Sequence, residues 1–374
     1  MSETLHAVCL VAGIVVVVGT LWSVFSTLIV PRSNTSHLLR AVAEVITGVA
    51  RPMRRRLRTY EARDRLMAIV GPLSMISLFI AWLVLLIIGF GLITFWVSDG
   101  TGFGHALAIS GSSVFTLGVV SGRRGSTESL EFIAAGCGLL VIAMEIAYLP
   151  TLYSAFATRE SQVTLLATRG GIPAWGPEIL TRSQWFHTMA ELPELYANWE
   201  RWAAEVSESH TNYPSLMWFR SPASDRSWLL GLLAMLDAAA LHDATCPGSS
   251  PRQARLFLQM GTNCLRSLAG ALRLEYDPDP VPLAPIRLTY GEYMEGITRM
   301  QSVDFPMERT PDEAWRHFRG WRVNYESIVD QLTEIIMAPV GPWVLERPEL
   351  GPPRAPRIFD RTPDQPYPDR PAAH

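Results

Sequence analysis

The chain has 374 residues, of which 48% are hydrophobic and 18% charged, and the apolar residues are concentrated in three long segments that are nearly free of charge. This pattern excludes a purely soluble enzyme, a secreted disulfide scaffold and a disordered protein, and the four cysteines show no zinc or disulfide spacing. The formal net charge of -3 combines a basic first part, residues 1–158, with a mildly acidic remainder, so no nucleic-acid partner is predicted.

Residues 1–31 contain the first predicted membrane helix. Residues 7–31 carry no formal charge, and this length exceeds the roughly 20 residues that cross a bilayer. The short segment before them contains no arginine, and no A-x-A cleavage site follows. We therefore expect a retained membrane helix and not a cleaved signal peptide.

Residues 32–65 form a predicted linker with nine arginines and three acidic residues. By the positive-inside rule this linker is cytoplasmic, so we expect the N-terminus outside and everything after the third helix inside. The sequence has arginine but no lysine, a bias typical of GC-rich bacterial genomes, which indicates the inner membrane of a bacterial cell. The cluster Arg51–Arg58 either contacts anionic lipid or only sets the topology, and both interpretations stay open.

Residues 66–158 contain two further predicted membrane helices, an outer helix at 66–98 and an inner helix at 130–156, with an unusual segment at 103–122 between them. From residue 101 this stretch reads T-G-F-G-H-A-L-A-I-S-G-S-S-V-F-T-L-G-V-V-S-G. It is too rich in glycine for a spanning helix and too apolar for an exterior loop. A segment that enters the membrane and returns accounts for both properties. His105–Phe115 is the predicted short helix, about 16 Å long.

The order of these elements resembles the pore module of potassium-channel-like, pore-loop cation channels. The resemblance implies that four copies surround one axis, and that backbone carbonyls of a filter, T-V-G-Y-G in that family, replace the water shell of an ion. It implies that two serines end the pore helix and that five residues after it form the filter. The serines are Ser112 and Ser113, and the filter positions are Thr116, Leu117, Gly118, Val119 and Val120.

The predicted filter departs from the family pattern at its outer end. Gly118 is retained, but Val120 stands where the family has its second glycine. Filter glycines permit left-handed backbone, in which β-branched residues are strained. Either Ser121 and Gly122 rebuild the outer filter or one coordination site is lost. Potassium is therefore the expected permeant monovalent cation, but strict selectivity is not predicted.

The predicted inner helix contains three residues of interest for a pore. Gly136 and Gly138 predict either tight helix packing or a gating hinge. Glu145 is an ionisable residue within a membrane helix, and such residues usually face a protein interior or water. Two interpretations of its face, shared with Gly138 and Val141, stay open: it lines a fourfold cavity, or a neighbouring helix satisfies the carboxylate.

Residues 159–345 predict a globular, α-helical cytoplasmic domain. Within it, residues 228–241 are apolar but too short to span a membrane, so we expect a buried core helix there. Residues 346–374 are rich in proline and predict a flexible tail. Helical patterns lie at about 178–209, 224–242, 251–276, 284–302 and 311–338.

The sequence contains no nucleotide-binding, metalloprotease or hydrolase motif, so no catalytic residue and no cofactor is predicted. His242, Cys246 and Cys264 are expected to be buried side chains and not a metal site. The overall prediction is an all-α membrane protein that forms a homotetrameric cation channel. The alternative is a membrane-anchored helical adaptor or sensor with a non-conducting hairpin, and a weaker one is an enzyme with an intramembrane site at Glu145.

Overall fold

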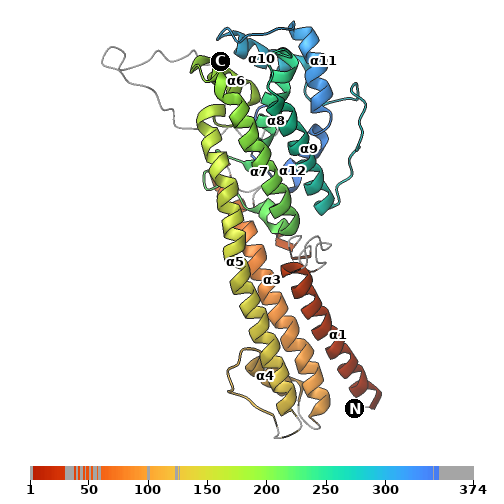
Figure 1. Ribbon diagram of the computed structural model, residues 1–374. Coiled ribbons are helices and arrows are strands. Elements are labelled where there is room, and N and C mark those ends of the chain that lie inside the picture. The colour runs from red at the N-terminus through yellow and green to blue at the C-terminus, as the bar shows by residue number, and fades with distance from the viewer. Residues whose placement is uncertain are drawn as a thin grey trace, which may run out of the picture.

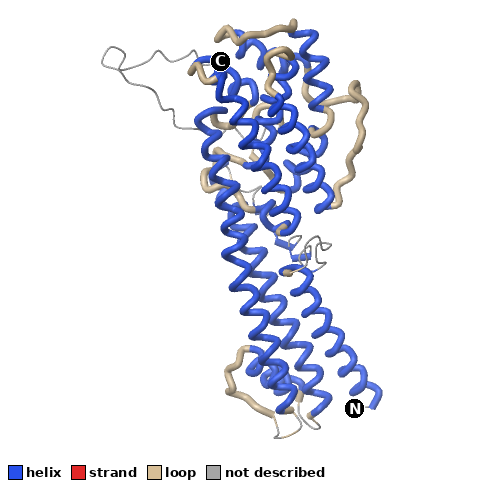
Figure 2. The backbone as a smooth tube through the Cα atoms, in the orientation of Figure 1, coloured by secondary structure: helices blue, strands red, loops and turns tan. Residues whose placement is uncertain are grey.

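The computed structural model describes a defined set of residues, namely 3–29, 38, 41–42, 45–46, 48–49, 52–53, 57, 60–98, 102–122, 125, 127–339 and 341–344. The described chain forms helices and turns without strands, which confirms the all-α prediction (Figure 2). It is elongated, with long helices at one end and a compact helical domain at the other (Figure 1). The arginines of the cluster at 51–58 and the predicted tail at 346–374 lie outside the described residues.

Three of the described helices are long and apolar enough to cross a membrane, as predicted. They are α1 (Glu3–Leu28), α3 (Tyr60–Val97) and α5 (Glu128–Gly170). The 38 residues of α3 and the 43 residues of α5 exceed the roughly 20 that a bilayer requires. The extra length carries α5 directly into the helical domain, without a break between the apolar part and that domain (Figure 1).

Helix α1 packs closely along α3 because glycines face each other at their contact. A Cβ atom at Gly13 would lie 2.7 Å from the carbonyl oxygen of Gly89, and one at Gly89 would lie 2.7 Å from Val17. Small residues let two apolar helices approach at the backbone, where dispersion contacts are most numerous. The indole of Trp82 also donates a hydrogen bond of 3.1 Å to the hydroxyl of Ser23.

The helical domain is built around α8 (Trp228–Thr245), every residue of which is buried. This confirms the predicted core helix. The predicted helix at 178–209 is in fact two helices, because the chain turns between Phe186 and Glu191. The domain's remaining elements are α6 (Gly176–Trp185), η1 (Met189–Glu191), α7 (Leu192–Asn212), η2 (Pro214–Trp218), α9 (Arg252–Leu272), α10 (Tyr290–Gln301), α11 (Pro311–Arg322) and α12 (Glu326–Ile335).

A buried ionic network ties α8 to the last helices of the domain. The Arg322 guanidinium donates to Asp237 Oδ2 at 2.6 Å and to Glu326 Oε1 at 2.8 Å. It also donates to the carbonyl of Trp343 at 2.6 Å, and the hydroxyl of Tyr325 donates to Asp237 at 2.8 Å. Each of these charges is buried, so the network is stable only while all of its members are present.

The short helix η2 and the residues that follow it connect the domain to both α3 and α5. The buried Arg159 of α5 donates to the carbonyls of Leu216 and Phe219 at 2.8 and 2.7 Å. On the other side, Arg220 forms an ion pair of 2.5 Å with Asp64 of α3. The helical domain is therefore attached to both long helices through these contacts.

Candidate pore segment

The short helix α4 (Phe103–Val114) lies between α3 and α5 at the end of the molecule remote from the helical domain (Figure 1). It occupies the region of the predicted pore helix, with bounds shifted by one or two residues. A Cβ atom at Gly91 of α3 would lie 2.7 Å from Leu107 of α4. The hydroxyls of Thr94 and Ser110 also lie 3.3 Å apart. Gly91 and Thr94 of α3 thus form the surface against which α4 packs.

A tight turn reverses the chain at the end of α4. The amide of Thr116 donates to the carbonyl of Ser113, and that of Leu117 to the carbonyl of Ser112, each at 2.8 Å. These two bonds define a Schellman motif, whose turning residue has left-handed backbone and is usually glycine. Here Thr116 takes that conformation, with φ of 55°. A β-branched residue is strained there, so the neighbouring contacts must hold it in place.

The hydroxyl of Ser112 holds the returning backbone from behind. It accepts hydrogen bonds from the amides of Val119 at 3.0 Å and Val120 at 3.1 Å. In a planar trans peptide the carbonyl points opposite to the amide, so the carbonyls of Gly118 and Val119 point away from Ser112. Gly118 has φ of 65°, the second left-handed residue of the segment. The backbone therefore turns two successive carbonyls away from its own helix.

The side chains of this segment are exposed in the single chain. Leu117 is 64% and Val119 79% exposed, although both are apolar. The left-handed residues are Thr116 and Gly118, whereas Val120 has no positive φ. Left-handed backbone in this segment is therefore confined to Thr116 and Gly118. The predicted pore helix serines, Ser112 and Ser113, are both buried in the last turn of α4.

Gly138 of α5 is the contact point for the end of α4. A Cβ atom at Gly138 would lie 2.0 Å from the carbonyl oxygen of Val114. By contrast, Gly136 is exposed, and a Cβ atom there would meet no atom within 4 Å. Of the two interpretations left open for these glycines, tight packing therefore applies to Gly138, and Gly136 takes no part in that contact.

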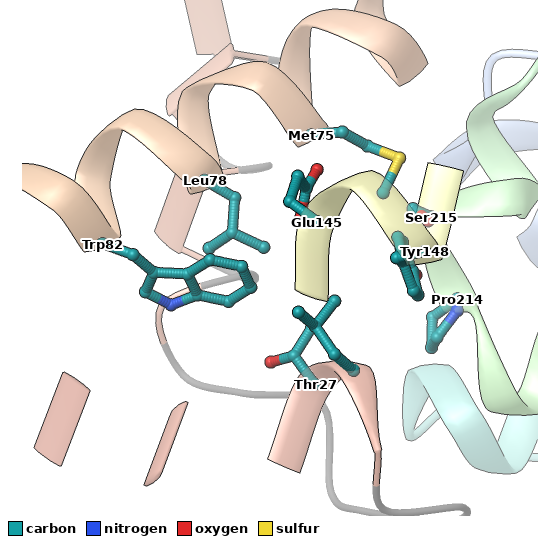
Figure 3. A pocket seen from close by; sticks show the side chains of 9 residues that line it. Thr27, Met75, Leu78, Trp82, Glu145, Tyr148, Pro214 and Ser215 are labelled. Atoms are coloured by element: carbon teal, nitrogen blue, oxygen red, sulfur yellow. The ribbon is translucent and has the colours of Figure 1, made fainter. Parts of the chain in front are cut away.

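Glu145 lies in a small pocket inside one chain and not on the exposed side of α5 (Figure 3). The structure places it with Gly138 and Val141 on the buried face of α5, whereas Ile146 and Leu149 are exposed. Of the two interpretations left open for Glu145, this burial within one chain disagrees with a position on a fourfold cavity and agrees with a face that packs against neighbouring helices. Apolar residues flank both faces of α5, so their spacing does not identify the face that packs against α1 and α3. The pocket is lined by Thr27, Leu28, Met75, Leu78, Trp82, Tyr148, Pro214 and Ser215.

The Glu145 pocket has a volume of about 20 Å³, which accommodates one water molecule. Hydroxyl side chains of Thr27, Tyr148 and Ser215 line it together with apolar groups. Among the described residues that line the pocket, Glu145 is the only carboxylate, and none is a histidine or cysteine.

Sequence reasoning missed one residue of this region, Glu131 in the first turn of α5. Its Oε1 atom accepts a hydrogen bond of 2.9 Å from the amide of Gly122 and one of 2.8 Å from the hydroxyl of Thr127. Acidic residues are common in the first turn of helices, where they interact with the helix dipole. The sequence therefore gave no signal that this carboxylate reaches back to the loop.

The three residues weighed as a metal site, His242, Cys246 and Cys264, are held by other partners or buried in the core. The ring of His242 forms a hydrogen bond of 3.2 Å with the hydroxyl of Tyr196, and Cys246 donates to the carbonyl of Pro306 at 2.6 Å. Within the described ranges no group of three His, Cys, Asp or Glu side chains is arranged to hold a metal ion.

Burial makes His242 a source of pH-dependent stability. Desolvation of the charged ring lowers its pKa from 6.5 to about 4. The unfolded chain therefore binds a proton below pH 6.5 while the folded chain does not, so stability falls as the pH drops from 6.5 to 4. We expect a loss of about 3 kcal/mol over this window. Thermal unfolding of His242→Asn, which cannot titrate, should show a weaker pH dependence than wild type. Equal pH dependence of the two proteins would contradict this assignment.

Comparison with family models, curated proteins and solved structures finds no match to this chain. The features of the chain that bear on its function are therefore the geometry of α3, α4 and α5, the segment 116–122 and the charge distribution of the sequence.

Proposed function

We propose that the chain forms a homotetrameric channel for monovalent cations, with potassium the expected ion, and that ions pass along the backbone of residues 116–122. The observation that carries the proposal is the double hydrogen bond to Ser112, which turns the carbonyls of Gly118 and Val119 away from that side chain. Carbonyl oxygens that project from a held backbone can replace the water shell of a cation.

The depth of α4 supports this proposal. Its last residue, Val114, meets α5 at Gly138, ten residues after the start of that helix at Glu128. At 1.5 Å per residue this is about 15 Å, half of the roughly 30 Å hydrocarbon core of a bilayer. The C-terminal end of a helix carries a partial negative charge from the helix dipole, which stabilises a nearby cation.

The exposed apolar surface supports an assembly of several copies. Phe115, Leu117 and Val119 project from the loop, and Phe132 and Leu139 project from α5. In a tetramer these side chains would pack against neighbouring copies, and the four loops would surround one axis. With the arginine-rich linker in the cytoplasm, the loop faces outward and the helical domain lies inside the cell. That domain, joined to α3 and α5 through η2, would then assemble or gate the pore.

One observation favours the alternative function, a membrane-anchored helical adaptor with a structural hairpin. The Schellman motif by itself accounts for the left-handed backbone of Thr116, without any ion. Ion flux separates the two functions. Purified protein in liposomes with a potassium or sodium gradient should dissipate that gradient faster than empty liposomes. Flux equal to that of empty liposomes for both ions would favour the adaptor.

Gly118 offers a test of the conducting backbone with a matched control. We expect Gly118→Ala to reduce flux about tenfold, because an alanine at positive φ costs roughly 1–2 kcal/mol and tilts the carbonyls of the segment. Gly125→Ala is the control, since Gly125 also has positive φ and equally open surroundings but lies outside the proposed path. Equal flux through the two variants would exclude residue 118 from the conducting path.

A further inference from the structure

The outer end of the segment 116–122 is held by a second contact, distinct from Ser112. Glu131 accepts the amide of Gly122 and the hydroxyl of Thr127 on the same carboxylate oxygen, at 2.9 and 2.8 Å. A Cβ atom at Gly122 would lie 2.1 Å from the Thr127 hydroxyl and 3.0 Å from that oxygen. Only glycine can approach so closely, so the loop is seated against the start of α5 at this point.

The contact fixes the direction of one more peptide group. The amide of Gly122 points toward Glu131, so the carbonyl of Ser121 in the same planar peptide points away from it. The left-handed alternation ends at Gly118, and the outer part of the segment lacks the second filter glycine. This part therefore depends on side chains behind it, and Glu131 is the side chain that holds its last peptide.

We propose that Glu131 is a positioning residue of the pore, whose carboxylate orients the Ser121 carbonyl and thereby sets the ion selectivity of the outer end. This inference rests on the proposed channel function. The role belongs to the hydrogen-bonding geometry and not to the negative charge, because a carbonyl-type oxygen at the same place accepts the same two donors. A carboxylate makes these bonds stronger than a neutral acceptor does.

Three substitutions at position 131 separate geometry from charge. Glu131→Ala removes the acceptor, Glu131→Asp keeps the charge but withdraws it by one methylene, and Glu131→Gln keeps an acceptor oxygen without the charge. Glu128→Gln is the matched control, since Glu128 is exposed in the same turn of α5. Each full-length protein is placed in a planar bilayer with potassium on one side and sodium on the other, and the reversal potential gives the permeability ratio.

The expected result is a change of about fivefold in the permeability ratio for Glu131→Ala, the factor that corresponds to one ordinary hydrogen bond. Glu131→Asp should shift the ratio in the same direction and stands in for Glu131→Ala should that variant fail to assemble. Glu131→Gln and Glu128→Gln should keep the wild-type ratio.

An unchanged ratio in Glu131→Ala or Glu131→Asp would overturn the inference, and so would a shift in Glu131→Gln as large as that in Glu131→Ala, which would assign the effect to charge. An equal shift in Glu128→Gln would assign it to the surface potential of the mouth. In each of these cases, a current carried by the wild-type protein would still support the channel function. Absence of wild-type current would instead overturn the channel function, and the inference with it.

Discussion

Replacement of Gly138 with alanine is expected to reduce cation flux at least tenfold. The new Cβ atom would lie 2.0 Å from the carbonyl oxygen of Val114 and 2.8 Å from its carbonyl carbon. These are backbone atoms of the last helical residue of α4, so they cannot rotate away as a side chain could. Forcing extra volume into such a contact costs roughly 1–3 kcal/mol and shifts the backbone. The shift displaces the end of α4 and the loop that begins there.

Gly136→Ala is the control for this substitution, because it adds the same methyl group to α5 at an exposed position with no atom within 4 Å. Both variants are compared with wild type by liposome flux, after gel filtration shows that they assemble alike. Gly136→Ala should conduct as wild type does. Wild-type flux through Gly138→Ala would show that the contact between α4 and α5 does not position the conducting segment.

Replacement of Arg322 with methionine is expected to destabilise the helical domain by about 3–5 kcal/mol. The substitution leaves the carboxylates of Asp237 and Glu326 buried without their cation and removes the donor to the Trp343 carbonyl. Methionine fills a similar volume, so the loss comes from uncompensated charge more than from an empty space. A change of this size lowers the melting temperature by on the order of 10 °C in a domain of this length.

Arg255→Met is the matched control, since Arg255 also pairs with an aspartate, Asp243, at 2.7 Å. The Arg255 side chain is 61% and that of Asp243 10% exposed, so water reaches this pair from the side of the cation and its loss should cost less than that of the fully buried network. Tryptophan fluorescence of the full-length protein during heating measures both variants. Similar melting temperatures for Arg322→Met and Arg255→Met would show that the buried network does not hold the domain together.

The sequence alone predicts those elements whose local residue pattern is compatible with only one structure. Segments that are nearly free of charge and longer than a bilayer requires predicted α1, α3 and α5. Their length alone supports the assignment, whatever they pack against. The capping box at Thr310 and Glu313 is visible as a threonine followed by Pro311 and two acidic residues, and both of its hydrogen bonds are formed. The position of α4 followed similarly from an apolar, glycine-rich stretch between two membrane helices.

The sequence alone does not predict which residues face inward or which distant groups form hydrogen bonds, because packing between elements determines both. Both flanks of α5 are apolar, so nothing in its spacing indicates that Gly138 and Glu145 face inward while Leu139 and Ile146 are exposed. The hydrogen bonds of Ser112 to residues seven and eight positions later arise only after the loop has turned back. Glu131 likewise gains its partner nine residues away through that same turn.

The contact of η2 with two long helices was equally invisible in the sequence. Asp64 and Arg220 are 156 positions apart, and Arg159 binds carbonyls about 60 positions away. Contacts of this separation depend on the tertiary arrangement, and no local periodicity reports them. The connection of the helical domain to both long helices therefore emerges only from the three-dimensional structure.

The most direct measurement of the central claim is a particle map of the purified protein in lipid nanodiscs containing potassium. A homotetrameric channel should appear as a fourfold assembly in which the carbonyls of Gly118 and Val119 from four copies surround one axis, with ion density on that axis. A monomer or dimer, or an assembly in which the segments 116–122 lie apart from one another, would contradict it.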